Sequence, residues 1–188
     1  MRQPIGIAED EIISKCKTGS LKYQEMLYKY FYGFAMGISL RYCLSKDDAL
    51  EVVNDAFIKV FNSIDGYKND RPFKAWFRVI IINTAIDRRR KELKYQLNIE
   101  LENAKPILSA SIALENLNVQ DILKLMKELP AIQTTIFNLF EIDGYSHDEI
   151  AGILNIPASS SRVYLSRAKE KLRSLIKSEA RNHERAVR

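Results

Sequence analysis

The side chains best suited to recognising another molecule lie close together after residue 160. Arg162 and Arg167 can each present two parallel N–H donors to a guanine edge or to a phosphate. At helical spacing, Ser166 and Lys169 approach the same face as these arginines, and acidic residues are scarce before Glu170. This combination of residue types and spacing is typical of a surface that contacts DNA bases and phosphates.

Two helices joined by a tight turn are predicted to position this surface. In residues 146–177, Ser146 can cap the first helix while Glu149 returns a hydrogen bond to the cap, which is a capping box. Asn155 follows where the chain must turn, and asparagine tolerates the left-handed backbone that such a turn requires. Pro157 prevents the first helix from continuing. The sequence therefore predicts a helix-turn-helix.

The second helix of this motif is expected to be amphipathic. Its candidate capping residues are Ser159 and Ser160. Its apolar side is formed by Val163, Leu165, Ala168, Leu172 and Leu175. A helix of this kind fits the major groove of DNA. The alternative, a helical hairpin of a bundle that binds no nucleic acid, remains open at this point.

Length and charge narrow the class of protein. A chain of 188 residues with 46% hydrophobic residues can form one ordinary domain or two small ones, and it is too apolar to be largely disordered. The formal net charge is +5. Positive residues cluster at residues 88–91 and from Arg162 to the C-terminus, which favours a polyanionic partner such as DNA or RNA.

Cysteine and histidine usage argues against a disulfide framework and a metal site. Cys16 and Cys43 are too few for such a framework, and His147 and His183 have no zinc-like spacing. We expect both cysteines to be small buried residues in a protein of a reducing compartment, with no metal and no cofactor. The most apolar stretch, residues 77–82, is too short to span a bilayer. The sequence thus predicts a soluble cytoplasmic protein without membrane insertion.

The first part of the chain is predicted to be helical throughout. A short helix is expected over residues 9–17, a longer aromatic helix over residues 21–44, and a third helix that begins at Ser45. The inward stripe of the second helix is expected to be Tyr23, Leu27, Tyr30, Phe34, Ile38 and Tyr42. That of the third helix is expected to be Ala49, Val53, Ala56, Val60 and Ile64. We interpret both stripes as core.

The third predicted helix also carries an acidic stripe. Asp48, Glu51 and Asp55 recur at helical spacing on a side away from its apolar residues. Such a stripe is often only a solvated face. Because a protein that grips DNA elsewhere would not place several acids against phosphate, the stripe can instead meet a basic surface of a protein partner.

A polar loop and the helix after it form a second candidate nucleic-acid surface. Gly66 ends the third helix, and the polar residues 67–71 precede a helix expected over residues 73–94. This helix is apolar at Trp76 and Phe77 and becomes strongly basic further along. Aromatic and basic residues beside a polar loop can hold an unstacked base and the backbone on either side of it. We interpret the two aromatic residues as core and place the base pocket in the loop.

These segments predict an all-α fold of two small helical domains joined by a linker. We assign residues 1–95 to the first domain and residues 96–120, where helical periodicity weakens, to the linker. Periodicity resumes in residues 121–178, the second domain, and a basic tail of residues 179–188 follows. In the second domain Pro130 is expected to start a helix with the inward residues Ile132, Ile136, Phe137 and Phe140.

Taken together, three stretches resemble the extracytoplasmic-function (ECF) sigma factors of bacterial RNA polymerase, which belong to the sigma-70 family. They are DALEVVNDAFIKVFNSIDGY at residues 48–67, PFKAWFRVIIINTAIDRRRKE at residues 72–92, and LPAIQTTIFNLFEIDGYSHDEIAGILNIP at residues 129–157, followed by the helix RVYLSRAKEKL. Their order is specific to the family. The resemblance implies two helical domains. The first would bind core polymerase and the melted minus-ten promoter element, and the second would bind the minus-thirty-five element as duplex.

The resemblance also implies roles for individual residues. The acidic stripe of Asp48, Glu51 and Asp55 resembles the family's surface for the clamp helices of the largest polymerase subunit. The resemblance implies that the loop captures a flipped base of the non-template strand through Tyr67, Lys68, Asn69 and Asp70. It also implies that the next helix reads the minus-ten element through Asn83, Asp87 and Arg88. The expected minus-thirty-five surface consists of Ser160, Arg162, Val163, Ser166, Arg167 and Lys169.

Three residues depart from the family's pattern. Ser161 occupies a position where the family usually has valine, and Val163 one where serine is common. Asn155 occupies a position where the family usually has glycine. The base sequence that the family prefers is therefore not carried over to this chain. An anti-sigma protein is a further candidate partner.

Two other functions fit the same residues. A helix-turn-helix regulator would bind an operator as a dimer, without polymerase, and would shift its site alone in a gel. A helical adaptor would leave the basic clusters merely solvated, so that its chromatography on heparin would be insensitive to salt. An enzyme has little support, because the sequence shows no nucleophile-base pair and no glycine-rich phosphate loop.

Overall fold

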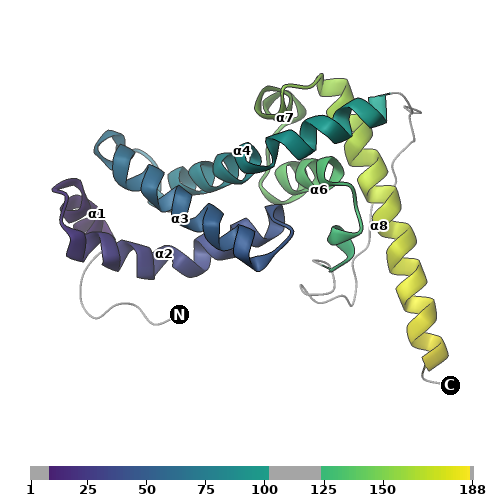
Figure 1. The fold of residues 1–188 in the computed structure, drawn as a ribbon, viewed down its shortest axis with the longest axis horizontal. Coiled ribbons are helices and arrows are strands. Elements are labelled where there is room, and N and C mark those ends of the chain that lie inside the picture. Colours follow the sequence, from purple (N-terminus) through teal and green to yellow (C-terminus); the bar gives the residue numbers. More distant parts are fainter. Residues whose placement is uncertain (1–8, 102–123, 187–188) are drawn as a thin grey trace. The chain divides into compact units, whose positions relative to one another are not determined.

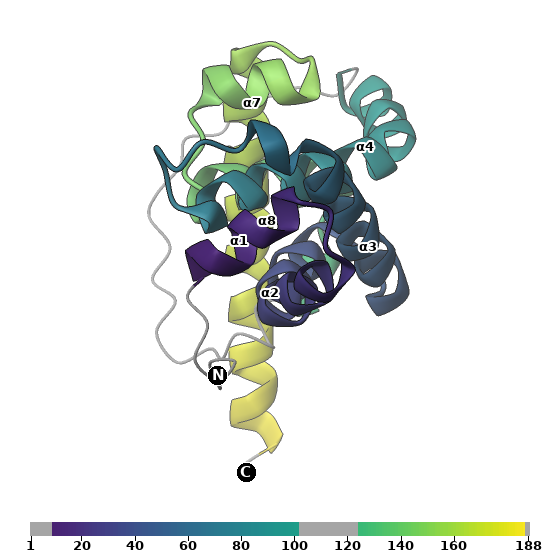
Figure 2. The same cartoon turned by 90° about the vertical axis from the view of Figure 1, so that its left-hand side faces the viewer.

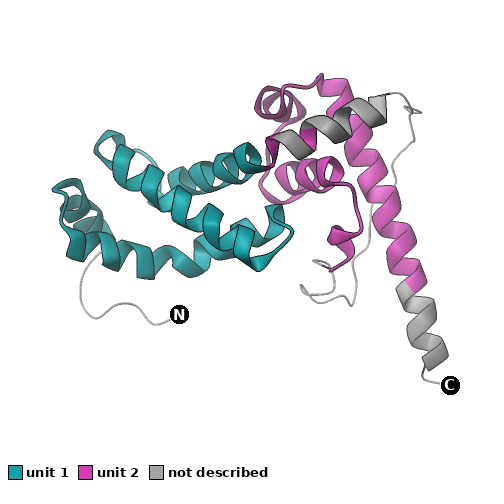
Figure 3. Ribbon diagram, in the orientation of Figure 1, with its two compact units in different colours: residues 1–88 teal, residues 89–188 magenta. Residues whose placement is uncertain are grey.

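The computed structural model describes residues 9–101 and 124–186, and every regular element in these ranges is a helix. The chain divides into two compact units, residues 1–88 and residues 89–188 (Figure 3). The prediction of an all-α fold is therefore confirmed. The division falls inside one continuous helix, α4 (Phe73–Leu101), so no break in secondary structure marks the end of unit 1.

Helix α4 corrects the expected start of the linker. The sequence predicted a connection over residues 96–120, but residues 96–101 belong to α4. The remainder of that predicted linker, residues 102–120, lies outside the described residues. The helix continues because leucine, glutamine and glutamate, which are frequent in residues 96–101, have good helix propensity even where the apolar periodicity weakens.

The helices of unit 1 begin and end at residues that the sequence marks clearly. Before α4 come α1 (Glu9–Lys17), α2 (Leu21–Tyr42), α3 (Lys46–Ser63) and the single 3-10 turn η1 (Ile64–Gly66). Gly19, with φ of 74°, separates α1 from α2, because this backbone region costs glycine little. The Ser45 side chain caps α3 by accepting the Asp48 backbone N–H at 3.0 Å. Helix α2 packs along α3, and α1 packs against α2 and η1 (Figures 1 and 2).

Aromatic side chains form the centre of unit 1. The ring of Phe77 in α4 lies 4.8 Å from that of Phe57 in α3, 5.8 Å from Phe73 and 6.1 Å from Phe31 in α2, measured between centroids. All four side chains are at most 2% exposed. Tilted and edge-on ring pairs of this kind add to the stabilisation that burial provides. The assignment of Phe77 to the core is confirmed, whereas Trp76, which was also assigned to the core, is half-buried.

The buried stripe of α2 differs in part from the predicted one. Buried as predicted are Leu27, Ile38 and Tyr42, whereas Tyr23, Tyr30 and Phe34 are only half-buried. Phe31 and Ala35 take the inward positions between them. Because α2 has apolar residues on most of its sides, its period alone does not select the inward face. In α3 and η1 all predicted inward residues are buried, although Leu50 and Ile58 on other sides of α3 are exposed.

Unit 2 contains the helix-turn-helix and the segment that supports it. Its named elements are α6 (Ala131–Phe137), the π-helical turn η2 (Asn138–Ile142), α7 (His147–Leu154) and α8 (Ala158–Ala186). Pro130 is the N-cap of α6, so a helix begins where the sequence predicted. Both α6 and α7 pack against α8 (Figure 1). Residues 179–186 of the predicted basic tail continue α8.

Phe140 is the predicted core residue of unit 2 that the structure corrects. Ile132, Ile136 and Phe137 are buried as expected, but Phe140 is half-buried. It lies in η2, where the Asp143 backbone N–H bonds to the Asn138 carbonyl at 2.9 Å, five residues back. The wider turn rotates Phe140 away from the stripe that a regular α-helix would have continued.

Both cysteines are buried, as predicted. Burial raises the pKa of the Cys16 thiol to about 11. Its thiolate is therefore scarce near neutral pH, which suits a structural residue.

None of the helices in residues 9–101 and 124–186 combines the length and the apolar character that crossing a membrane requires.

Candidate nucleic-acid interface

The turn between α7 and α8 closes as the sequence predicts. The Ser146 hydroxyl accepts the Glu149 backbone N–H at 3.3 Å, and a Glu149 carboxylate oxygen accepts the Ser146 backbone N–H at 2.8 Å. Asn155 is in the left-handed region, with φ of 55° and ψ of 53°. The capping box and the left-handed turn are both confirmed, and together they determine where α7 begins and ends.

The start of α8 differs from the prediction in one detail. Ser159 and Ser160 were expected as caps, but the helix already begins at Ala158, so both serines lie inside its first turn. The Ser161 backbone N–H donates to the Pro157 carbonyl at 3.2 Å. Pro157 can stand at this boundary because its fixed φ suits the start of a helix.

Helix α8 presents two different sides. Its buried residues are Ser161, Tyr164, Leu165, Ala168 and Leu172. Val163 and Leu175, which were predicted as apolar packing residues, are only half-buried. Among the predicted DNA-contacting residues, Arg162 is exposed, and Ser160, Val163, Ser166 and Arg167 are half-buried. Most of the predicted surface is therefore accessible from solvent. Arg162 is the predicted base-reading side chain with the greatest freedom to reach a groove.

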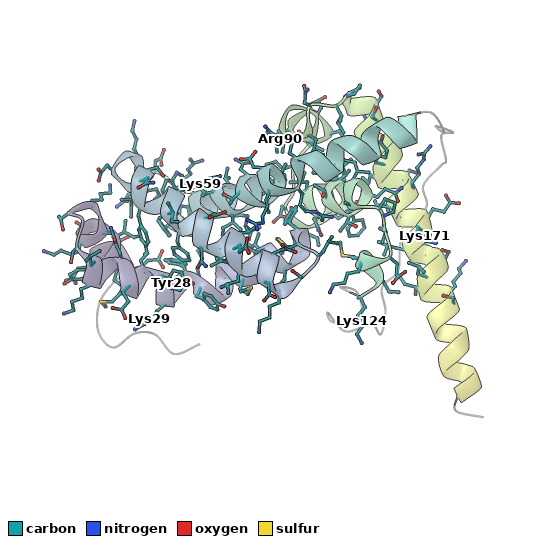
Figure 4. All side chains as sticks on the ribbon, in the orientation of Figure 1. Tyr28, Lys29, Lys59, Arg90, Lys124 and Lys171 are labelled. Carbon is teal, nitrogen blue, oxygen red and sulfur yellow. The ribbon has the colours of Figure 1, made fainter. Side chains whose placement is uncertain are left out.

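Lys169 has a protein partner in the structure. Its Nζ lies 2.5 Å from Oε1 of Glu141 in η2, and its side chain is 21% exposed. A phosphate would have to compete with this ion pair for Lys169. Lys171, on α8 in Figure 4, is exposed and is better placed for a contact of that kind.

His147 is a residue of this surface to which the sequence assigned no role. Its ring stacks on Phe140, with centroids 4.4 Å apart, and its Nδ1 lies 2.9 Å from the Ser161 hydroxyl oxygen. Burial lowers the pKa of His147, and the positive charges of Arg162 and Lys169 lower it further, against the opposing effect of Asp148. The imidazole thus favours its neutral form inside the helix-turn-helix.

This lowered pKa gives an expected dependence of stability on pH. The unfolded chain binds a proton at the ordinary histidine pKa of about 6.5, whereas folded His147 binds it only at lower pH. In that window the unfolded state holds more protons, so the free energy of unfolding should decrease as the pH falls, until folded His147 is also protonated. Urea unfolding between about pH 5 and about pH 8 measures this effect. The His147→Phe variant should lack this component, and an identical pH dependence in both proteins would contradict it.

The acidic stripe of α3 is exposed but not isolated. The side chains of Glu51 and Asp55 are 57% and 52% exposed, and Arg88 of α4 forms ion pairs with both, directly with Glu51 and at 3.7 Å with Asp55. Asp48 is half-buried at the start of α3, where one of its carboxylate oxygens accepts the Ser45 hydroxyl at 2.6 Å. The structure therefore brings a predicted DNA-contacting residue, Arg88, onto the predicted polymerase-binding stripe.

A second ion pair joins the same two helices. Lys59 of α3, labelled in Figure 4, lies 3.7 Å from Asp87 of α4. Asp87 and Arg88 of α4 thus both form ion pairs with residues of α3. Asn83, one turn earlier in α4, is exposed. Exposed pairs of this type are weak, about 0–1 kcal/mol, so a ligand can displace them.

The loop predicted to capture a base is anchored by its tyrosine. Tyr67 is 6% exposed, and its ring packs against Trp76 at 5.1 Å between centroids. Its hydroxyl donates to the Arg71 carbonyl at 2.7 Å, and its own carbonyl accepts Lys17 Nζ at 2.8 Å. Tyr67 therefore holds the loop in place and does not offer its ring to solvent. The other predicted loop residues, Lys68, Asn69 and Asp70, are exposed.

Two arrangements in these surfaces were not predicted from the sequence. The link from His147 to Ser161 spans the turn of the helix-turn-helix, and the link from Arg88 to Glu51 and Asp55 joins α3 to α4. No local sequence pattern predicts either of these two contacts, because each depends on how two helices pack. The available signals were a polar Ser161 among the apolar positions of α8, and a basic run in the helix that follows the acidic stripe.

Comparisons with known proteins agree with this geometry. Residues 27–94 match the family model of Sigma-70 region 2, and residues 119–172 match that of Sigma-70, region 4. A solved structure of the sigma factor RpoE in complex with the anti-sigma factor NepR from Bartonella quintana shares the fold. Its TM-score is 0.53 at 20% identity, and the match covers 84% of this chain and 98% of that chain.

Related sequences extend the agreement over most of the chain. The ECF RNA polymerase sigma-E factor of Escherichia coli (strain K12) is 26% identical over 176 residues, which cover 87% of this chain and 92% of the relative. The ECF RNA polymerase sigma factor SigW of Bacillus subtilis (strain 168) is 30% identical over 146 residues, covering 69% of this chain and 76% of the relative. With both sigma-70 regions matched in one chain and a relative that is 30% identical over 69% of it, the chain belongs to the extracytoplasmic-function sigma factors of RNA polymerase.

Proposed function

We propose that unit 1 binds core RNA polymerase and the melted minus-ten element, and that unit 2 reads the minus-thirty-five element as duplex. As an ECF sigma factor, the protein directs core polymerase to specific promoters and promotes strand opening at initiation. We assign these roles to a first domain of residues 1–95 and a second domain of residues 121–178, with no catalytic step in either. The observation that carries the proposal is the exposed Arg162 at the start of the second turn of α8, on a helix-turn-helix whose first helix is capped.

The polymerase contact is assigned to the stripe of Asp48, Glu51 and Asp55. Glu51 and Asp55 keep more than half of their side-chain surface exposed although Arg88 pairs with them. A basic partner surface would compete with Arg88 for these carboxylates. Binding of polymerase would then leave Arg88 available to DNA, so one residue would serve the two roles in succession.

The minus-ten contact is assigned to the exposed loop side chains and to the exposed side of α4. Lys68 can meet the backbone, while Asn69, Asp70 and Asn83 offer the donors and acceptors that an unstacked base requires. Tyr67 supports this role, because the hydrogen bond from its hydroxyl to the Arg71 carbonyl holds the loop in its conformation. A loop held in advance loses less conformational entropy when it captures a base.

Charge reversal of the acidic stripe is expected to weaken core binding. In a variant with Asp48, Glu51 and Asp55 all changed to lysine, each lost rim contact should cost about 0.2–1 kcal/mol, and the loss should be largest at low salt. The measurement is titration of the variant with core polymerase at two salt concentrations. A matched control carries the same change of net charge on α1, α2 and η1, at the exposed Glu11, Glu25 and Asp65. Equal affinities for the two variants would refute the assignment.

Run-off transcription with core polymerase on genomic fragments tests the proposed function as a whole. A sigma factor should start transcripts at a defined set of promoters, and the starts should disappear without it. A helix-turn-helix regulator would instead bind its site tightly without polymerase. A specific gel shift by the protein alone, together with no run-off product, would overturn the proposal.

A protein partner and a compartment complete the proposal. Bartonella quintana RpoE is held by the anti-sigma factor NepR in its solved structure. We propose an anti-sigma protein as a further partner of this chain, one that would keep it from polymerase until a signal releases it. Its place of action is the cytoplasm, where core polymerase and promoter DNA meet.

A further inference from the structure

One imidazole joins three elements of unit 2. His147 is the first residue of α7, Phe140 belongs to η2, and Ser161 lies at the end of the first turn of α8. The His147 and Phe140 rings stack with only 24° between their planes, and Ser161 is 0% exposed. A hydroxyl buried this completely destabilises the fold unless it finds a partner, and the His147 Nδ1 at 2.9 Å supplies one.

This hydrogen bond joins one side of α8 to α7. Successive residues of an α-helix are rotated by roughly 100° about its axis. With Ser161 turned toward α7, the next residue, Arg162, must point to a different side, and it is exposed there. Any rotation of α8 that broke the contact between His147 and Ser161 would also change the direction of Arg162.

A second contact holds α8 to the same support. Lys169, two turns beyond Ser161 and roughly 12 Å further along the axis, pairs with Glu141, the neighbour of Phe140 in η2. Because the hydrogen bond at Ser161 and the ion pair at Lys169 lie at different positions along α8, together they restrict both its rotation and its sliding along its axis. The π-helical turn η2 is the common base, since Phe140 and Glu141 are consecutive residues in it.

We propose that His147 is a positioning residue for duplex recognition, which holds α8 through Ser161 at the rotation that aims Arg162 at the DNA. The proposal rests on the assignment of duplex reading to unit 2. His147 makes no base contact in this arrangement. Its effect is on specificity, because a base-reading arginine discriminates only when its guanidinium is held at the right angle to the base edge.

The test compares holoenzymes on one promoter and its variants. The promoter is one selected by run-off transcription with the unaltered protein, and the variants carry single-base changes in its upstream element. The quantity measured is the discrimination ratio, the affinity for the promoter divided by that for a variant. His147→Phe keeps an aromatic ring on Phe140 but removes the hydrogen bond, and Ser161→Ala removes the other partner. Ser174→Ala, the same change at an exposed site of α8, is the matched control.

The expected result is a specific loss at the base that Arg162 reads. His147→Phe and Ser161→Ala should each lower the discrimination ratio there about two- to twelve-fold, and the double variant should lose no more than either single one. Core binding and the control variant should be unchanged. An unchanged ratio in His147→Phe, or an equal loss of affinity for all promoter variants, would overturn the positioning role.

Arg162→Ala, measured in parallel, separates this inference from the proposed function. If it leaves the ratio unchanged at every base, duplex reading through Arg162 is wrong and the positioning role falls with it. If Arg162→Ala lowers the ratio and His147→Phe does not, the proposed function stands and only the role of His147 is wrong.

Discussion

Replacing Arg162 with alanine is expected to relax promoter specificity at one base of the minus-thirty-five element. Arg162 is exposed at the start of the second turn of α8, near the N-terminal end by which a recognition helix contacts base edges. A guanidinium that bonds a guanine with two donors is worth about 1–3 kcal/mol of discrimination. Holoenzyme binding to all single-base variants of the upstream element, at two salt concentrations, measures this effect. The preference at one position should fall while the others keep theirs.

Lys171→Ala provides the contrasting control for Arg162. Lys171 is exposed further along α8, where a phosphate contact is expected. Its loss should weaken binding to every promoter variant alike and lower the slope of log affinity against log salt by about one unit. If Arg162→Ala behaved in this same uniform manner, Arg162 would be a phosphate contact and its base-reading role would be refuted.

Replacing Phe77 with alanine is expected to destabilise unit 1 by about 3–5 kcal/mol, the usual cost of emptying a large aromatic site in a core. Phe77 is 0% exposed and packs against Phe57, Phe73 and Phe31 from three helical segments. Because whole domains are stable by only about 5–15 kcal/mol, this loss should also reduce core-polymerase binding. Urea unfolding followed by the fluorescence of Trp76, the single tryptophan of the chain, reports on unit 1 directly.

The same substitution at Phe61 is the matched control for Phe77. Phe61 is half-buried on α3 and its ring lies 5.9 Å from that of Phe57. Phe61→Ala should cost clearly less than Phe77→Ala, because less surface is buried and the site is open to solvent. Equal costs at the two positions would contradict the aromatic core described for unit 1.

Local sequence alone determined the helices and their boundaries where short-range chemistry decides them. The capping box of Ser146 and Glu149, the left-handed Asn155 and the cap at Ser45 are all formed by residues within four positions of one another. Such contacts depend on the backbone of one turn and need no information about packing. The inward face of α3 was also predicted from the sequence, because Ala49, Val53, Ala56 and Val60 recur at helical spacing. The order of the three quoted stretches likewise indicated the family.

Tertiary structure decided which side of an ambiguous element faces inward and which charged groups meet. The choice of Phe31 over Tyr30 and Phe34 in α2 depends on α3 and α4, because α2 is apolar on several sides. Phe140 left the predicted stripe because η2 takes a wider turn than an α-helix. The burial of Tyr67 depends on aromatic contacts with α4.

The polar contacts of the two surfaces were decided in the same way. Arg88 meets Glu51 and Asp55, and His147 meets Ser161, only because two neighbouring helices pack with one relative rotation in each case. Residue types and spacing identify groups that can bind DNA or polymerase. They do not specify which of those groups already hold one another, because an ion pair or hydrogen bond forms only at a separation of a few ångströms, and helix packing sets that separation.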